Sequence, residues 1–333
     1  MSGEGAELER AAAVLAEASE VAIACHVNPD ADALGAMLGL AAVLRARGVR
    51  VVCAVPNEPR HLPRWAQLLP GADELVRVER FPAAPAVMVT CDCASIDRLA
   101  ALRPAAERAN ELIWIDHHRS NDGAGTIRVV DPAASSTCEL VVRLADALGA
   151  ELPTQAAVCL YAGIVTDTGR FQYEATTPET LRIAARLREH PFDHARLAQA
   201  LYEDRDRAAL SLMALALTRL TFEPEADLVW TYLTQADLRK AGVHPAETDE
   251  LIDLIRTDRE ADVAAVLKQQ WDGRFKVSMR SRGAHDLAAI AARFGGGGHR
   301  LAAGYTSAHG PAATIEELVR ELRAAPAATA SGG

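Results

Sequence analysis

Four short apolar runs in the first half of the chain limit its fold more than any other feature. They alternate with stretches of helical periodicity and lack the strict polar–apolar alternation of a strand with one face in water. Strands of this kind, separated by helices, are typical of a parallel sheet covered by helices on both faces. The predicted strands are residues 21–26, 49–55, 86–92 and 111–116, and the predicted helices are 31–48, 135–149 and 154–169.

The pattern changes after a helical region at 177–217. Four more apolar runs follow at 226–234, 263–271, 274–281 and 301–307, with helical segments near 246–256, 286–294 and 314–324. We therefore expect an α/β protein of two domains. The predicted parts are a parallel-sheet domain at 1–190, a helical linker at 191–217, a smaller α/β domain at 218–325 and a disordered tail at 326–333.

Composition indicates a globular protein that works in the cytoplasm. Half of the 333 residues are hydrophobic and 24% are charged. The first twenty residues contain acids, lack a basic segment and are typical of an amphipathic helix rather than a secretory signal. No apolar run reaches the roughly 18–20 residues of a membrane span, so we expect no membrane association.

The net charge of −10 argues against a protein that binds long duplex nucleic acid, because such proteins usually carry a basic surface. Small phosphate compounds remain possible ligands if metal ions and local arginines supply positive charge. The six cysteines form no CxxC pair, and most lie in apolar segments, so we expect buried free thiols. They are Cys25, Cys53, Cys91, Cys93, Cys138 and Cys159.

Acidic residues and histidines stand at the ends of three predicted strands, where His26, Asp92 and Asp116 are found. The carboxyl ends of parallel strands form one edge of a sheet, which is where ligands bind in such folds. A charge removed from water there costs several kcal/mol unless it is paired or bound to a metal ion. Further candidates lie in the same motifs: Asp30 and Asp32 in HVNPDAD, His117 and His118 in IDHH, and Asp167 in TDTG.

Each of these motifs alone has an ordinary structural interpretation, as a turn, a helix cap or a surface histidine pair. Together they offer carboxylates and imidazoles that can surround two divalent ions. A set of oxygen and nitrogen ligands without thiolate suits manganese, magnesium or iron better than copper or structural zinc. Two such ions can activate a water molecule and neutralise a phosphoester.

These motifs, in this order, resemble those of the DHH phosphoesterases, whose name describes the triplet Asp116, His117 and His118. The segment 295–304 (GGGGHRLAAG) resembles the signature of the C-terminal domain associated with that family. The resemblance covers roughly residues 20–325. Ala36 stands where many members have serine, which leaves the candidate ligands unchanged.

The resemblance implies two manganese ions per subunit, with Mg²⁺ or Co²⁺ as substitutes. One ion would be held by His26, Asp30 and Asp92, and Asp92 would bridge to the second ion. His118 would contact the scissile phosphate, and Asp116 would orient the histidines. The implied ligands of the second ion are Asp32, Asp92, His117 and Asp167.

The second predicted domain offers a candidate substrate-binding loop. Consecutive glycines allow backbone N–H groups to approach an anion, and basic residues follow the loop and the preceding strand. The resemblance assigns the loop and His299 to the substrate's distal phosphate or nucleotide. The candidate residues are Gly295, Gly296, Gly297, Gly298, His299, Arg300, Arg280 and Arg282.

We therefore expect a manganese-dependent hydrolase of small nucleotides: short oligoribonucleotides, 3′-phosphoadenosine 5′-phosphate (pAp) or cyclic di-AMP. The sequence resembles the branch of the family with oligoribonuclease and pAp phosphatase activity, and the cyclic di-AMP phosphodiesterases are the nearest alternative. A DHH-type pyrophosphatase or polyphosphatase and a non-catalytic nucleotide-binding regulator are further alternatives. A homodimer is possible.

Overall fold

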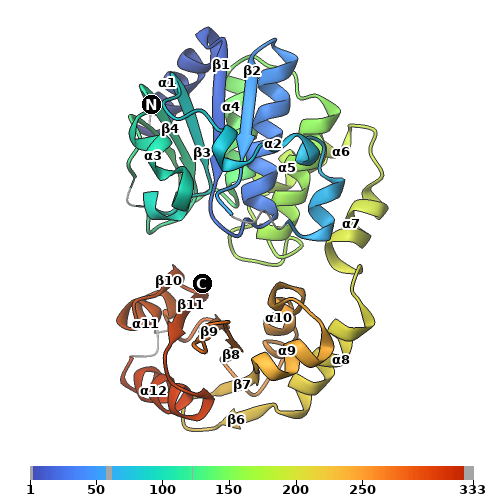
Figure 1. The fold of residues 1–333 in the computed structure, drawn as a ribbon, viewed down its shortest axis with the longest axis vertical. Coiled ribbons are helices and arrows are strands. Elements are labelled where there is room, and N and C mark those ends of the chain that lie inside the picture. Colours follow the sequence, from blue (N-terminus) through green and yellow to red (C-terminus); the bar gives the residue numbers. More distant parts are fainter. Residues whose placement is uncertain (1–2, 58–61, 122, 326–333) are drawn as a thin grey trace. The chain divides into compact units, whose positions relative to one another are not determined.

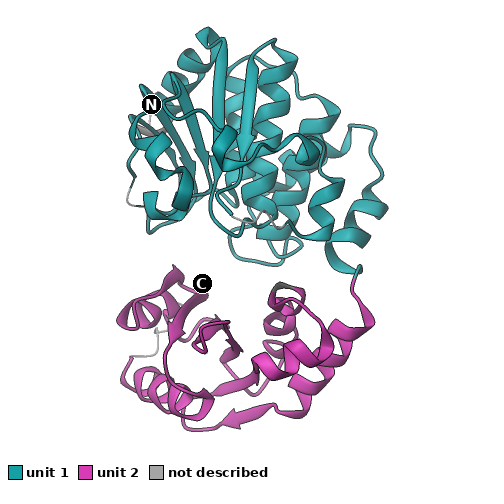
Figure 2. Ribbon diagram, viewed as in Figure 1, with its two compact units in different colours: residues 1–204 teal, residues 205–333 magenta. Residues whose placement is uncertain are grey.

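The computed structural model describes residues 3–57, 62–121 and 123–325. The chain divides into two compact units, Met1–Asp204 and Arg205–Gly333 (Figure 2). The predicted linker at 191–217 contains α7 (His194–Tyr202) and most of α8 (Arg207–Thr218), and the division falls between these helices. The predicted tail at 326–333 lies outside the described residues.

Five parallel strands form the sheet of the first unit among its described residues (Figure 1). Their order is β2-β1-β3-β4-β5, and every neighbouring pair is parallel. The sequence patterns predicted the first four strands but not β5, which is four residues long. The strands are β1 (Glu20–Cys25), β2 (Arg50–Ala54), β3 (Val87–Cys91), β4 (Glu111–Asp116) and β5 (Ile127–Val130).

Side chains of each strand alternate between two hydrophobic cores. Val21, Ile23 and Cys25 of β1 face the larger core, whereas Ala22 and Ala24 face the smaller one. Both faces of the sheet are thus buried, which explains the continuous apolar runs in the sequence. The larger core is completed by α1 (Gly3–Glu17), α2 (Ala31–Ala46), α4 (Thr137–Ala147), α5 (Thr154–Asp167), α6 (Pro178–Arg188) and α7, and the smaller by η4 (Ile96–Leu102) and α3 (Arg103–Glu107).

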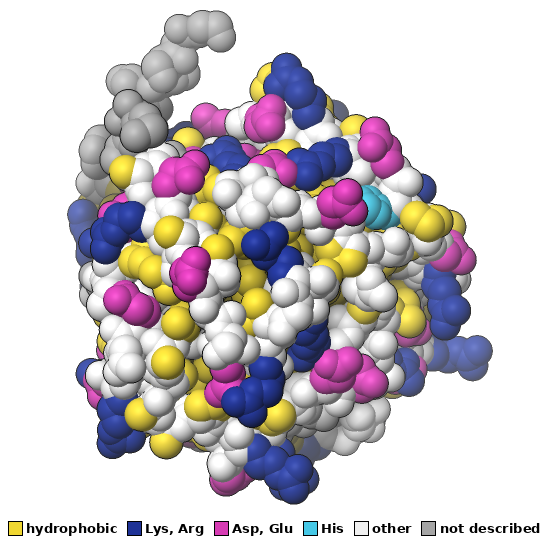
Figure 3. All heavy atoms as spheres, turned by 90° about the horizontal axis from the view of Figure 1, so that it is seen from above, with side chains coloured by type: hydrophobic (Ala, Val, Ile, Leu, Met, Phe, Trp, Pro, Cys, Tyr) yellow, Lys and Arg dark blue, Asp and Glu magenta, His cyan; other side chains and the backbone are white. Residues whose placement is uncertain are grey.

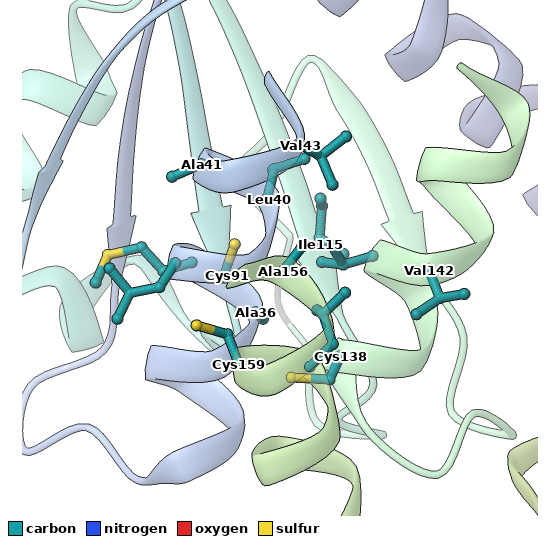
Figure 4. Packing of buried hydrophobic residues seen from close by; sticks show 14 of the residues in the cluster. Ala36, Leu40, Ala41, Val43, Cys91, Ile115, Cys138, Val142, Ala156 and Cys159 are labelled. Atoms are coloured by element: carbon teal, nitrogen blue, oxygen red, sulfur yellow. The ribbon is translucent and has the colours of Figure 1, made fainter. Parts of the chain in front are cut away.

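Close packing between α2 and α5 depends on glycine. A Cβ atom at Gly35 would lie 2.4 Å from the carbonyl oxygen of Cys159, and one at Gly39 would lie 2.6 Å from the Leu160 side chain. Figure 4 shows buried side chains of this core, among them Ala36 of α2 and Ala156 and Cys159 of α5. The two helices that carry Asp32 and Asp167 are therefore held close together.

All six cysteines are buried free thiols, as the sequence predicted. Burial raises the pKa of every one of them; that of Cys53 rises to about 12.

The second unit has a six-stranded mixed sheet with the order β10-β11-β9-β8-β7-β6 among its described residues. Only β7 and β8 pair in parallel. The sequence predicted four of these strands and missed β6 and β10, which have three residues each. The strands are β6 (Thr221–Glu223), β7 (Leu228–Leu233), β8 (Val263–Gln269), β9 (Phe275–Ser281), β10 (Gly297–His299) and β11 (Ala302–Ser307).

Helices cover both faces of this sheet, and α9 is a helix that the sequence patterns did not predict. One face packs on α11 (Leu287–Arg293) and α12 (Pro311–Ala324), and the other on α8, α9 (Gln235–Ala241) and α10 (Leu251–Ile255). The expectation of an α/β fold with two sheets is confirmed. Short 3₁₀ turns complete the chain at η1 (Arg64–Leu68), η2 (Ala72–Glu74), η3 (Val78–Arg80) and η5 (Pro245–Thr248).

The surface drawn in Figure 3 mixes acidic, basic and hydrophobic side chains without a large patch of one charge. No described helix combines the length and the apolar character required to cross a membrane.

The α2–α5 contact generates a stability prediction. Gly35→Ala should lower the free energy of unfolding by about 1–3 kcal/mol, because the added Cβ meets backbone that cannot rotate away. Chemical denaturation measures the change. Gly310→Ala is the control, since nothing lies within 4 Å of its added Cβ. Equal stability of the Gly35 variant and the wild type would contradict the close packing.

Candidate metal centre

The candidate ligands gather because parallel strands end at one edge of the sheet. His26 directly follows β1, Asp92 directly follows β3, and Asp116 is the last residue of β4. Asp92 has a left-handed backbone with φ of 60°, an uncommon conformation outside glycine that is often found at functional sites. Its amide donates to the Ile115 carbonyl oxygen at 2.9 Å, which holds this turn against the neighbouring strand.

The turn after β1 brings His26 and Asp30 next to Asp92. Asp30 caps α2, because its Oδ1 accepts a hydrogen bond from the Ala33 amide at 3.0 Å. The Nε2 atom of His26 lies 3.4 Å from Asp92 Oδ2 and 3.9 Å from Asp30 Oδ2. These three side chains form the first group able to surround a cation.

A second group surrounds His117. Its Nε2 atom lies 3.7 Å from Asp92 Oδ1, 3.9 Å from Asp32 Oδ2 and 3.3 Å from Asp167 Oδ2. Asp32 comes from the first turn of α2 and Asp167 is the last residue of α5. Asp32, Asp92 and His117 can all reach one ion, so Asp92 belongs to both groups.

The chemistry of this donor set fits divalent cations. Burial and then the charge of Asp92 raise the pKa of Asp32 to about 7, and burial with the charges of Asp32 and Asp92 raises the pKa of Asp167. Burial opposes protonation of His26, but Asp30 and Asp92 outweigh it and raise the pKa of His26 to about 10. Without metal, protons on these side chains compensate the negative charge of the cluster. Bound divalent cations would compensate the same charge and displace the protons.

His118 is placed differently from His117. Its side chain is 24% exposed, against 8% for His117, and its Nδ1 lies 2.7 Å from Asp116 Oδ1. Asp116 is fully buried and accepts a second hydrogen bond from Asn121 Nδ2 at 2.5 Å. Burial lowers the pKa of His118, but Asp116 and Asp92 more than compensate and raise it. The sequence analysis did not identify Asn121.

The start of α4 is the main part of the site that the sequence analysis missed. The amides of Thr137 and Cys138 donate to the two carboxylate oxygens of Asp32 at 2.7 and 2.9 Å. The Thr137 hydroxyl donates to Asp92 Oδ1 at 2.9 Å. The first N–H groups of a helix lack partners within the helix, so α4 is suited to hold carboxylates.

This helix start is itself fixed by buried hydrogen bonds. Ser136 caps α4 by accepting from the Glu139 amide, and the Glu139 carboxylate accepts from the hydroxyls of Ser135 and Thr180. The pattern Ser136-x-x-Glu139 in the sequence is typical of a helix start. It gives no indication that the helix points at Asp32 and Asp92.

In the second unit, the glycine run forms a tight turn against β11. A Cβ at Gly296 would lie 2.2 Å from the Gly304 carbonyl oxygen, and one at Gly298 would lie 2.5 Å from that of Ala302. Gly295 and Gly297 have open space beside them. Two of the four glycines are therefore needed for packing, and the other two leave the backbone open.

The predicted basic residues near this turn have different surroundings. His299 and Arg280 both pair with Ala302, so they lie in one row across the sheet. Arg282 donates to the Thr257 carbonyl oxygen at 3.1 Å, and Arg300 donates to that of Gly283 at 3.1 Å. Arg282 and Arg300 are thus partly engaged in holding loops.

Comparisons with known proteins find matches for both units of the chain. The profile of the DHH family, N-terminal domain, matches residues 20–164, and that of the DHHA1 domain matches residues 228–327. The bifunctional oligoribonuclease and PAP phosphatase NrnA of Thermus thermophilus is 36% identical over 285 residues, which are 85% of this chain and 83% of the relative. The chain belongs to the DHH family. Membership in this family confirms two predictions from the sequence: the family itself, and a hydrolase that acts on phosphoester bonds.

Two further comparisons concern a second relative and a solved structure. The cyclic-di-AMP phosphodiesterase GdpP of Geobacillus thermodenitrificans is 28% identical over 94% of this chain, which spans only 48% of that relative. The crystal structure of an exopolyphosphatase-related protein from Bacteroides fragilis has a TM-score of 0.88 and 24% identity, with 96% of each chain covered. The likeness to that structure supports the fold.

The contact between Thr137 and Asp92 generates a prediction on metal affinity. Thr137→Val keeps the side-chain shape but removes the hydroxyl, and should weaken Mn²⁺ binding by about 10–100-fold. Thr137→Ser should retain most of the affinity. Titration calorimetry with Mn²⁺ measures both. Thr231→Val, which removes a buried hydroxyl in the second unit, is the control; equal affinity of all three variants would contradict the role of Thr137.

The raised pKa values generate a prediction on pH. Metal binding requires the deprotonated forms of His26 and Asp32, whose pKa values are about 10 and about 7. The Mn²⁺ association constant should therefore rise by about tenfold or more per unit between pH 6 and pH 8. Calorimetry in buffers of different ionisation enthalpy should detect about one proton or more released per ion. Proton release near zero would contradict the assignment of His26, and His26→Gln should release fewer protons than the wild type.

Proposed function

We propose that this chain is a manganese-dependent phosphoesterase of small nucleotides with oligoribonuclease and pAp phosphatase activity. The observation that carries the proposal is the position of Asp92, which lies within ligand distance of two separate groups of imidazole and carboxylate donors. The name of the Thermus thermophilus relative supports the choice of substrates. The carboxylate and imidazole donors favour Mn²⁺, with Mg²⁺ or Co²⁺ as substitutes.

In this proposal the two donor groups hold one ion each. His26, Asp30 and Asp92 hold the first ion, and Asp92 also reaches the second. When bound, the ions promote attack by water and neutralise charge on the phosphate. The second ion is held by Asp32, Asp92, His117 and Asp167.

His118 acts on the substrate rather than on the ions, and Asp116 positions His118. Asp116 accepts from His118 Nδ1, which fixes the orientation of the ring. The raised pKa of His118 favours a ring that carries a proton, so it can donate to an oxygen on which charge develops. Asn121 keeps Asp116 in place from the other side.

The second unit supplies the contact to the rest of the substrate in this proposal. The open backbone at Gly295 and Gly297, together with His299 and Arg280, offers donors for a distal phosphate or nucleotide. Arg280, Arg282 and Arg300 each already donate to one backbone carbonyl oxygen, so each would bind the substrate through its remaining N–H groups.

Cyclic di-AMP hydrolysis is the second candidate. It is favoured by the match of the Geobacillus thermodenitrificans phosphodiesterase to 94% of this chain. One panel decides between the two candidates: the purified protein with Mn²⁺, incubated with pAp, with the linear dinucleotide pApA and with cyclic di-AMP. We expect pAp and pApA to be hydrolysed fastest, and all activity to disappear in chelator. Faster hydrolysis of cyclic di-AMP would favour the second candidate, and full activity in chelator would contradict both.

Replacement of the shared carboxylate tests the mechanism. Asp92→Asn should lower kcat by orders of magnitude, because a neutral amide cannot hold two cations, while asparagine tolerates the left-handed backbone. Circular dichroism should show an intact fold. Asp97→Asn, at an exposed position that pairs with Arg103, is the control. Retention of more than about a tenth of the activity, a loss below about 1.4 kcal/mol, would show that Asp92 is not shared.

A further inference from the structure

An arginine lies beside the candidate metal centre and belongs to none of the sequence motifs. Arg98 is in η4, six residues after Asp92, and its side chain is exposed. The backbone of η4 is fixed to the turn after β1, because the Val27 amide donates to the Arg98 carbonyl oxygen at 2.9 Å. Arg98 Nη2 lies 2.8 Å from His26 Nδ1.

This contact conflicts with the role of His26 as a ligand. His26 Nδ1 also lies 2.8 Å from the Val27 carbonyl oxygen, which can only accept a hydrogen bond. An imidazole that binds a metal ion through Nε2 keeps its proton on Nδ1, and that proton is then donated to Val27. Arginine only donates, so Nδ1 cannot serve as its acceptor in the metal-bound protein.

The guanidinium has no anionic partner in the described ranges of the chain. No carboxylate there lies within ion-pair distance of Arg98, although five aspartates form the neighbouring cluster. The other arginine of this segment differs, because Arg103 pairs with Asp97 and with Glu107. Arg98 is therefore a cation fixed next to the site, and His26 Nδ1, which donates to Val27, gives it no acceptor.

We propose that Arg98 is a substrate-binding residue that donates to a non-bridging oxygen of the nucleotide phosphate at the metal centre. This inference rests on the proposed function, since it requires a phosphate there. A guanidinium offers paired N–H donors that match phosphate geometry, and the bond is charge-assisted. The position beside His26 places this contact on the side of the first ligand group.

The test measures nucleotide binding and metal binding separately. Wild type, Arg98→Gln, Arg98→Lys and the control Arg103→Gln are titrated with Mn²⁺ alone, and then with AMP in saturating Mn²⁺. We expect Arg98→Gln to weaken AMP binding by about tenfold or more and to lower kcat/KM for pApA by a similar factor. Arg98→Lys should recover part of both losses, and Arg103→Gln should resemble the wild type. Mn²⁺ affinity should stay within about twofold in all four proteins.

Each alternative result has a definite meaning. Equal AMP affinity of wild type and Arg98→Gln, in a protein that hydrolyses pApA, overturns the role of Arg98 and leaves the proposed function intact. A loss of Mn²⁺ affinity in Arg98→Gln also overturns it, because Arg98 would then support His26 instead. A wild type that binds Mn²⁺ but neither binds AMP nor hydrolyses any nucleotide overturns the proposed function together with this inference.

Discussion

Repulsion between buried carboxylates is the constraint on which the rest of the first unit depends. Asp32 and Asp92 are buried and Asp167 is partly exposed, and all three lie within 3.9 Å of His117 Nε2. Charges removed from water are stable only beside donors or cations. The fold supplies donors from several directions: the amides at the start of α4 to Asp32, and the Thr137 hydroxyl to Asp92. Glycines 35 and 39 let α2 and α5 approach closely enough for their acids to meet.

The sequence predicted which acidic residues and histidines the fold brings together, because they stand at the ends of recognisable strands. A buried parallel strand is recognisable as a continuous apolar run, and the edge at which such strands end is fixed by topology. Residues that directly follow these runs, such as His26 and Asp92, therefore had to meet. The same argument identified most of the strands in the second unit, where each run is six or seven residues long.

What the sequence did not reveal depends on contacts between distant segments. Strands of three or four residues, such as β5, β6 and β10, are too short for a hydrophobic pattern and exist because a neighbouring strand pairs with them. In the sequence, Thr137 is recognisable only as a residue at the start of a helix. Its partner Asp92 is 45 residues away, so local patterns do not reveal the contact. In the sequence, Arg98 has the pattern of an ordinary surface residue. Its position beside the site is evident only from the structure, where His26 Nδ1 contacts both Arg98 and the Val27 carbonyl oxygen.

The buried thiols of the first unit have a practical consequence. All six cysteines precede residue 205, and their raised pKa values leave almost no thiolate in the folded protein near neutral pH. A thiol-reactive dye would therefore modify the protein only when the first unit opens. The rate of labelling would follow the opening of this unit alone, as an intrinsic reporter that requires no engineered site.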